Sequence, residues 1–187
     1  MTKIGADATI YIHKKGGSMA TPIEIERKYV ISMPEISRLS ELEGYTVSEI
    51  EQTYLTAAEG VTRRVRMRKY ADRTVYTETK KVRIGKISAF EDEREISEEE
   101  YRKCLCEKEA GTVTLKKTRH TFSYLGVTFE VDVYPEWEKS CILETELECV
   151  SQVVPFPEFL HVIQEVSGDK RYSNASMSRS FPPELSV

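Results

Sequence analysis

The sequence predicts an α+β domain made mainly of antiparallel β-structure, with eight strands closed into a tunnel or barrel. This tunnel is expected to have a charged lumen and peripheral amphipathic helices. Three observations lead to the prediction. Polar and apolar residues alternate with the period of a strand over most of the chain. Only three short segments have the period of a helix. The polar strand faces carry clusters of like charges.

Turn-forming residues, among them Gly60, Gly85 and Gly126, separate several of the predicted strands. Between these turns, successive side chains point to opposite faces, and one face of each strand is apolar. So many strands in a chain of 187 residues suggest one antiparallel sheet that closes or nearly closes. The predicted strands span residues 22–31, 47–56, 62–69, 74–82, 88–95, 112–124, 127–134 and 141–150.

Three segments have the apolar period of an amphipathic helix, and we expect them to cover the apolar outside of the strands. A capping box of Ser97 and Glu100 marks the start of the second helix. A glycine follows each segment and is a typical helix end. The predicted helices span residues 34–43, 101–110 and 157–166.

We expect one tunnel domain with a C-terminal helix over residues 20–187, preceded by an extraneous or disordered extension over residues 1–19. The extension contains a flexible Lys-Lys-Gly-Gly-Ser stretch, and Met19 directly after it offers an alternative start.

The 27 Lys and Arg residues nearly balance the 31 Asp and Glu residues, which gives a formal net charge of −4. A nucleic-acid-binding domain would show a clustered basic excess, so no nucleic-acid partner is expected. No apolar run approaches the ~18 to 20 residues that span a bilayer, and the N-terminus lacks a signal-peptide layout. We therefore expect a cytoplasmic protein without a membrane partner. The sequence is compatible with a homodimer.

Side chains at positions i and i+2 of a strand share one face, and six predicted strands carry two or three charges on such a face. One charged face is the ordinary solvated outside of an antiparallel sheet. Six such faces with segregated signs favour a shared lumen instead, because like neighbours repel. The clusters are Glu24, Glu26 and Lys28; Arg64, Arg66 and Arg68; Glu91, Glu93 and Glu95; Lys117 and Arg119; Glu130 and Asp132; and Glu144, Glu146 and Glu148.

Basic and acidic clusters in one lumen indicate a particular chemistry. Arginine and lysine side chains neutralise phosphate oxygens. Carboxylates in pairs hold a hard divalent cation such as Mg²⁺ or Mn²⁺, which in turn bridges phosphate oxygens. So much cationic surface suits a polyphosphate better than a single phosphomonoester. Displacement at phosphorus is the reaction that such a site favours.

Residues 24–28 have the form ExExK, residues 117–119 the form KxR and residues 146–148 the form ExE. In this order the motifs resemble those of the CYTH superfamily, the triphosphate tunnel metalloenzymes, and especially of its short bacterial members. The resemblance extends over residues 23–177. Further matching segments are residues 52–55, 64–68, 79–81, 90–96, 129–134 and 165–174.

The resemblance implies roles for individual residues. Tyr54 lies where some relatives have a tyrosine near the scissile phosphate, and Glu91 and Glu93 would orient water or cations. Lys28 and Lys170 would act in catalysis as well as in phosphate binding. The implied metal ligands are Glu24, Glu26, Glu146 and Glu148, with Asp132 beside them. The implied phosphate contacts are Lys28, Arg64, Arg66, Arg68, Lys81, Lys117, Arg119 and Lys170.

Two registers remain open at this point. The RxR motif fits either Arg64 with Arg66 or Arg66 with Arg68, and the TxK motif fits Lys80 or Lys81, with strand alternation favouring Lys81. Ala89 stands where relatives often have an arginine.

The expected function is that of a divalent-metal-dependent triphosphatase. It would hydrolyse the terminal phosphoanhydride of inorganic tripolyphosphate or an organic triphosphate, with Mg²⁺ or Mn²⁺ as cofactor. One alternative is a class IV adenylate cyclase, which would need an adenine pocket that no segment of the sequence indicates. Another is a non-catalytic polyphosphate- or nucleotide-binding module, which would not need the paired carboxylates. A purely structural barrel would instead expose these charges to bulk solvent.

Overall fold

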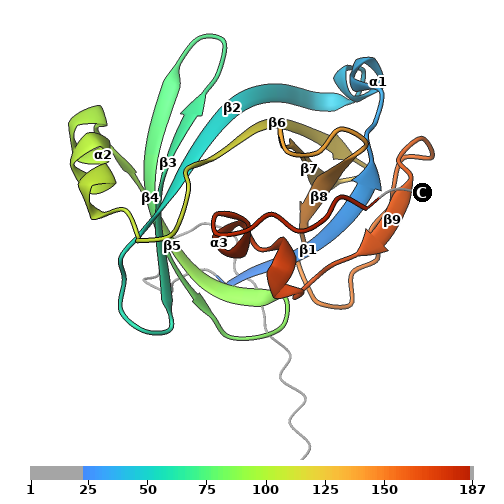
Figure 1. The fold of residues 1–187 in the computed structure, drawn as a ribbon. Helices are drawn as coiled ribbons and strands as arrows, with labels where there is room; N and C mark the ends of the chain where they lie inside the picture. Colours follow the sequence, from blue (N-terminus) through green and yellow to red (C-terminus); the bar gives the residue numbers. More distant parts are fainter. Residues whose placement is uncertain (1–22, 186–187) are drawn as a thin grey trace, which may run out of the picture.

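A computed structural model describes residues 23–185 of the chain, in which a nine-stranded antiparallel sheet curls into a ring (Figure 1). The expected N-terminal extension, residues 1–19, lies outside the described residues. The strands are β1 (Ile23–Ser32), β2 (Glu43–Leu55), β3 (Val61–Lys69), β4 (Thr74–Arg83), β5 (Ser88–Ile96), β6 (Leu115–Tyr124), β7 (Val127–Val133), β8 (Ser140–Glu146) and β9 (Val162–Glu165). The helices are α1 (Ile36–Ser40), α2 (Glu98–Cys104) and α3 (Asn174–Met177), with short 3₁₀ turns η1 (Leu105–Glu107) and η2 (Lys170–Tyr172).

The ring closes between β1 and β5, and eight strands take part in it. Around the ring the order is β5-β4-β3-β2-β6-β7-β8-β1, and all neighbouring pairs are antiparallel. The closing seam is short, because β1 pairs with β5 only from Ile23 to Ile25. Beyond the seam, β9 occupies the same edge of β1, with Tyr29 opposite Glu165. The predicted eight-stranded closed architecture is therefore confirmed, with one additional strand.

Apolar side chains lie on the outside of the ring, under covering segments. The outward-facing Ile25, Phe129 and Leu143 belong to a core cluster that α1 and the chain after β8 cover. A second outer cluster forms where α2 packs Tyr101 against Val65 of β3. The prediction that the strands turn their apolar faces outward and their charged faces inward is thus confirmed.

The predicted helix over residues 157–166 is wrong. These residues form a loop followed by β9, although Leu160 belongs to the outer cluster and Phe159 packs against it. Since β5 leaves β1 after three residue pairs, the edge of β1 would otherwise keep unpaired backbone groups, which β9 satisfies. The other two predicted helices form but are shorter: α1 ends at Ser40, and α2 continues into η1.

The C-terminal segment closes one end of the ring. Figure 1 shows α3 inside the outline of the strands. Tyr172 and Met177 of this segment pack against Tyr54, Leu115 and Tyr134, whose side chains point inward from the strands or from the end of β7. The lumen is therefore divided into an apolar plug and a charged remainder.

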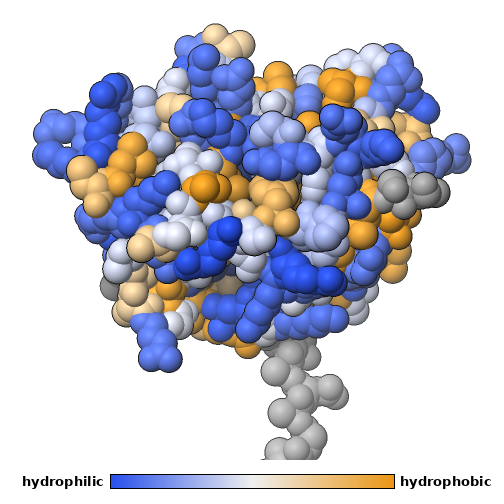
Figure 2. Space-filling view, in the orientation of Figure 1, coloured by the Kyte–Doolittle hydropathy of each residue, from blue (hydrophilic) through white to orange (hydrophobic). Residues whose placement is uncertain are grey.

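Polar side chains predominate on the face of the molecule shown in Figure 2, with apolar ones scattered among them. None of the helices within residues 23–185 combines the length and the hydropathy that crossing a membrane requires.

Met177→Ala is expected to lower the free energy of unfolding by ~2 to 5 kcal/mol, because Met177 is buried in the plug and the substitution leaves a cavity. Urea denaturation measures the change. Ile84→Ala, at a position that is 45% exposed, is the control and should change the free energy by less than ~0.5 kcal/mol. Equal stability of both variants would show that α3 does not close the ring in solution.

Candidate functional site

A cavity of about 500 Å³ fills the charged part of the lumen. All eight strands of the ring contribute to its wall, together with the C-terminal segment. Its basic lining residues are Lys28, Arg64, Arg66, Arg68, Lys81, Arg83, Arg119 and Lys170. Its acidic lining residues are Glu24, Glu26, Glu91, Glu93, Glu130, Glu144 and Glu146. The charges that the sequence placed on separate strands therefore meet in one cavity.

The lining of the cavity bears on both open registers. Arg64, Arg66 and Arg68 all line the cavity, so the RxR motif contributes in both registers. Lys81 lines the cavity as well, whereas Lys80 is exposed on the opposite face of β4.

Three of the predicted site residues do not line the cavity, namely Lys117, Asp132 and Glu148. Glu148 lies beyond the end of β8 and is exposed. Lys117 and Asp132 form a fully buried ion pair behind the cavity wall. The structure thus does not bring Asp132 and Glu148 together with the other carboxylates that the resemblance implied as metal ligands.

Asp132 is held by Arg119 and Lys117. Arg119 donates from Nε and Nη2 to the two carboxylate oxygens, each at 2.6 Å, and Nη2 also contacts Glu144 at 2.7 Å. Burial alone would raise the pKa of Asp132, but the positive charges of Arg119 and Lys117 lower it. Its carboxylate is therefore ionised and fully used in positioning cations, which leaves little capacity for a metal.

Lys28 continues this network toward the cavity. Its ammonium lies 2.5 Å from Glu144 and 3.5 Å from Glu26, and it donates to the Tyr172 main-chain carbonyl at 3.3 Å. Burial opposes the charge of Lys28, yet Glu144 and Glu26 raise its pKa, so the ammonium stays protonated. Lys28 thus ties Glu26 of β1 and Glu144 of β8 to the C-terminal plug.

The arginines of β3 are only partly neutralised. Arg64 Nη2 contacts Glu91 at 3.0 Å, but its Nε is buried without a hydrogen-bond partner. Arg66 is 4.0 Å from Glu93, and burial together with the neighbouring Arg64 and Arg119 lowers its pKa to about 10. A buried donor and a cation destabilised by other cations are both satisfied by an anion. An anion bound in this part of the cavity would satisfy both groups.

Gln52 belongs to the matching segment 52–55 but is not among the predicted site residues. Its Nε2 donates to the Tyr54 hydroxyl at 2.8 Å, and its Oε1 accepts from Arg66 at 3.4 Å. The Tyr54 oxygen accepts the hydrogen bond from Gln52, so the Tyr54 O–H remains free to donate to another group. Tyr54 lines the cavity, where a bound ligand could accept that bond. Burial raises the pKa of Tyr54, so the phenol is a hydrogen-bond donor. Gln52 shares the inward face of β2 with Tyr54, but its uncharged side chain does not belong to any of the charge clusters that mark the lumen in the sequence.

The carboxylates of β1 and β8 are crowded together, although Lys81 pairs with Glu24 and Lys28 lies 3.5 Å from Glu26. Glu26 and Glu146 are direct cross-strand partners of β1 and β8, and Glu24 follows on the same face. Burial raises the pKa of Glu24 to about 7, and its hydrogen bond with Glu91 acts in the same direction. Burial and the negative charges of Glu130 and Glu26 also raise the pKa of Glu146. Crowded carboxylates of this kind favour a bound cation.

The donor chemistry fits Mg²⁺ or Mn²⁺ bound together with phosphate. No group of three Asp, Glu, His or Cys side chains converges as a complete metal site within residues 23–185. Mg²⁺ does not need one, because it keeps several waters and commonly binds one or two carboxylates plus substrate phosphates. Glu26 and Glu146, with Glu24 beside them, are the residues that would hold such a cation.

Glu24→Gln is expected to raise the melting temperature of the metal-free protein by a few degrees at pH 8 and by little at pH 5. The folded-state pKa of about 7 lies above the usual value of 4.5, so ionisation of Glu24 removes stability as pH rises through this window. A variant that does not ionise avoids this loss. Thermal melts in a chelating buffer measure the difference, and Glu148→Gln, which removes an exposed carboxylate, is the matched control. A pH-independent difference would contradict the assignment.

Comparison with solved structures finds related folds. The inorganic triphosphatase NE1496 has 26% sequence identity and a TM-score of 0.54, over 89% of this chain and 100% of that chain. Another structure of NE1496 has 25% identity and a TM-score of 0.51, over 85% and 99% of the two chains. The PH1819 protein from Pyrococcus horikoshii OT3 has 22% identity and a TM-score of 0.52, over 65% and 77%.

No family model matches the sequence, and no curated protein matches it. The structural likeness extends over nearly the whole of NE1496, and it agrees with the motifs along the strands. The chain has the fold of the CYTH proteins, the triphosphate tunnel metalloenzymes.

Proposed function

We propose that this protein is a metal-dependent triphosphatase that hydrolyses the terminal phosphoanhydride of inorganic tripolyphosphate. The observation that carries the proposal is a pair of opposite charge excesses in one cavity. Arg66 is buried beside other cations, while Glu24 and Glu146 are buried beside other carboxylates, with only Lys81 paired to Glu24. A triphosphate with a divalent cation would neutralise both at once. The likeness to the inorganic triphosphatase NE1496 at 26% identity supports the same activity.

Different residues of the chain would bind the phosphate groups and the metal ion. Arg64, Arg66 and Arg68 bind the phosphate oxygens, and Lys28 and Lys170 add charge from the side of the plug. Mg²⁺ or Mn²⁺ held by Glu26 and Glu146 would polarise phosphoryl oxygens. Catalysis in such a site comes mainly from positioning and charge stabilisation, as in other phosphoryl transfers.

Glu93 is the carboxylate best placed to orient water. It accepts a hydrogen bond from Thr79 at 2.7 Å and lies 3.9 and 4.0 Å from Arg64 and Arg66. Glu91 is less available to accept a proton from water, because it is ion-paired with Arg64 and Lys81. Burial would raise the pKa of Glu91, but Arg64 and a hydrogen bond with Glu24 lower it to about 2. Water attacks the terminal phosphorus, pyrophosphate leaves with the bridging oxygen, and Glu93 accepts the proton of water.

The lining of the cavity favours an inorganic chain over a nucleotide. Among the described residues that line it, Tyr54 is the only aromatic one, and its hydroxyl is held by Gln52. A purine would find no stacking surface there, which also disfavours the cyclase alternative. A non-catalytic binding module would need only the cations, whereas the carboxylate group around Glu146 is also present.

Purified protein with Mg²⁺ or Mn²⁺ is expected to release phosphate from tripolyphosphate faster than from ATP or thiamine triphosphate, and to form no cyclic AMP from ATP. Malachite-green detection with and without each metal measures the release. Glu146→Gln should abolish turnover while retaining affinity for tripolyphosphate. No release from any of these substrates, or full activity of Glu146→Gln, would contradict the proposal.

Tyr54→Phe is expected to lower kcat for tripolyphosphate by ~10²-fold, the usual effect of removing one donor to a developing oxyanion. Gln52→Met should lower kcat less, by ~10-fold, since it only releases the Tyr54 hydroxyl and Arg66. In the Tyr54→Phe background, Gln52→Met should change kcat little further. Fully additive effects in this double-mutant cycle would show that Gln52 does not act through Tyr54.

A further inference from the structure

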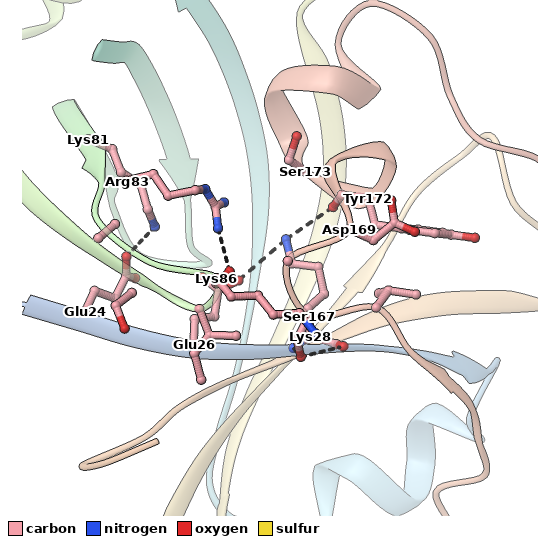
Figure 3. A pocket seen from close by; sticks show the side chains of 15 residues that line it. Glu24, Glu26, Lys28, Lys81, Arg83, Lys86, Ser167, Asp169, Tyr172 and Ser173 are labelled. Atoms are coloured by element: carbon pink, nitrogen blue, oxygen red, sulfur yellow. Dashed lines mark hydrogen bonds and ion pairs between the residues drawn. The ribbon is translucent and has the colours of Figure 1, made fainter. Parts of the chain in front are cut away.

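A second pocket, of about 50 Å³, adjoins the main cavity at the short seam between β1 and β5 (Figure 3). It lies between the β4–β5 turn and the chain from Val166 to Ser173. We call this the side pocket, and it shares part of its lining with the main cavity. Both cavities are lined by Glu24, Glu26, Lys28, Lys81, Arg83 and Ser173.

Two cations of the side pocket have no carboxylate partner within residues 23–185. Lys28 and Lys81 are ion-paired with glutamates of the main cavity, whereas Arg83 and Lys86 form no ion pair there. Arg83 Nη1 donates to the Lys86 main-chain carbonyl at 2.9 Å, which keeps both residues on one turn. The carboxylate of Asp169 lies on the opposite wall and is neutralised by Arg171 at 2.7 Å.

Two small residues leave space for the pocket and bring its walls together. Gly168 has φ +75°, and a Cβ there would lie 2.5 Å from Lys86 Cγ and 2.9 Å from the Lys86 carbonyl oxygen, so only glycine allows this approach. Ala89 is 3% exposed and pairs with Glu24 across the seam, where its short side chain lines the pocket. A larger residue at position 89 would fill this space.

We propose that the side pocket is a subsite for a fourth phosphoryl group, which Arg83 and Lys86 bind. This inference rests on the proposed triphosphatase function and extends its substrate class to linear polyphosphates longer than tripolyphosphate. Each added phosphoryl group brings further negative charge, and arginine and lysine are the side chains that bind it. Because Glu24 and Lys81 line both cavities, an unbranched inorganic chain bound in the main cavity would reach the pocket beside these two residues.

The test compares tetrapolyphosphate with tripolyphosphate. Lys86 lines only the side pocket, so Lys86→Ala should raise KM for tetrapolyphosphate roughly 5-fold, the size of an exposed charge contact, and leave tripolyphosphate unchanged. Ala89→Leu fills the pocket without changing charge and should cause the same selective loss. Lys80→Ala, on the outer face of β4, is the matched control and should affect neither substrate.

Calorimetric titration of the metal-free protein with both polyphosphates separates this subsite from the proposed activity. Wild type should bind tetrapolyphosphate more tightly than tripolyphosphate, and Lys86→Ala should abolish the difference. Equal affinity for both chains in wild type, or an unchanged preference in both variants, would overturn the subsite even if tripolyphosphate is hydrolysed. Absent hydrolysis with a selective loss of tetrapolyphosphate binding in Lys86→Ala would refute the triphosphatase proposal and retain the subsite.

Discussion

The structure depends on one constraint: charges that point into the ring must be neutralised by other charges inside it. Removing an ion from water costs several kcal/mol, which only well-placed partners offset. Arg119 meets this requirement for much of the lumen, because its guanidinium contacts Asp132, Glu130 and Glu144. Lys28 then carries the same network from Glu144 to β1.

Two groups that line the cavity, Arg66 and Glu24, are not fully neutralised by their neighbours. The low pKa of Arg66 reflects burial beside other cations, and the high pKa of Glu24 reflects burial beside other carboxylates. The ion pair of Glu24 with Lys81 offsets only part of this crowding, whereas Asp132 is held by both Arg119 and Lys117. Arg66 and Glu24 line the same cavity, and an anion bound together with a cation would neutralise them.

The eight ring strands and the direction of their faces could be predicted from the sequence, because period-two alternation is a local property. The C-terminal plug and β9 could not, because both depend on which strand edge and which end of the ring remain open. The helical period at residues 157–166 reflects apolar contacts that a loop also makes. Within the site, the charged residues were found by their clustering, whereas Gln52 is uncharged and Asp132 is distinguished only by burial.

The same strands supply both stability and the site, through alternate residues. On β1, Ile25 belongs to the outer core while Glu24 and Glu26 line the cavity. On β3, Val65 packs under α2 between Arg64 and Arg66. A slip of one residue in strand register would turn the apolar side chains into the charged lumen and the charged side chains against the apolar cover. The ladder register is therefore fixed by both faces at once, which explains how a lumen so rich in charge coexists with a uniquely folded ring.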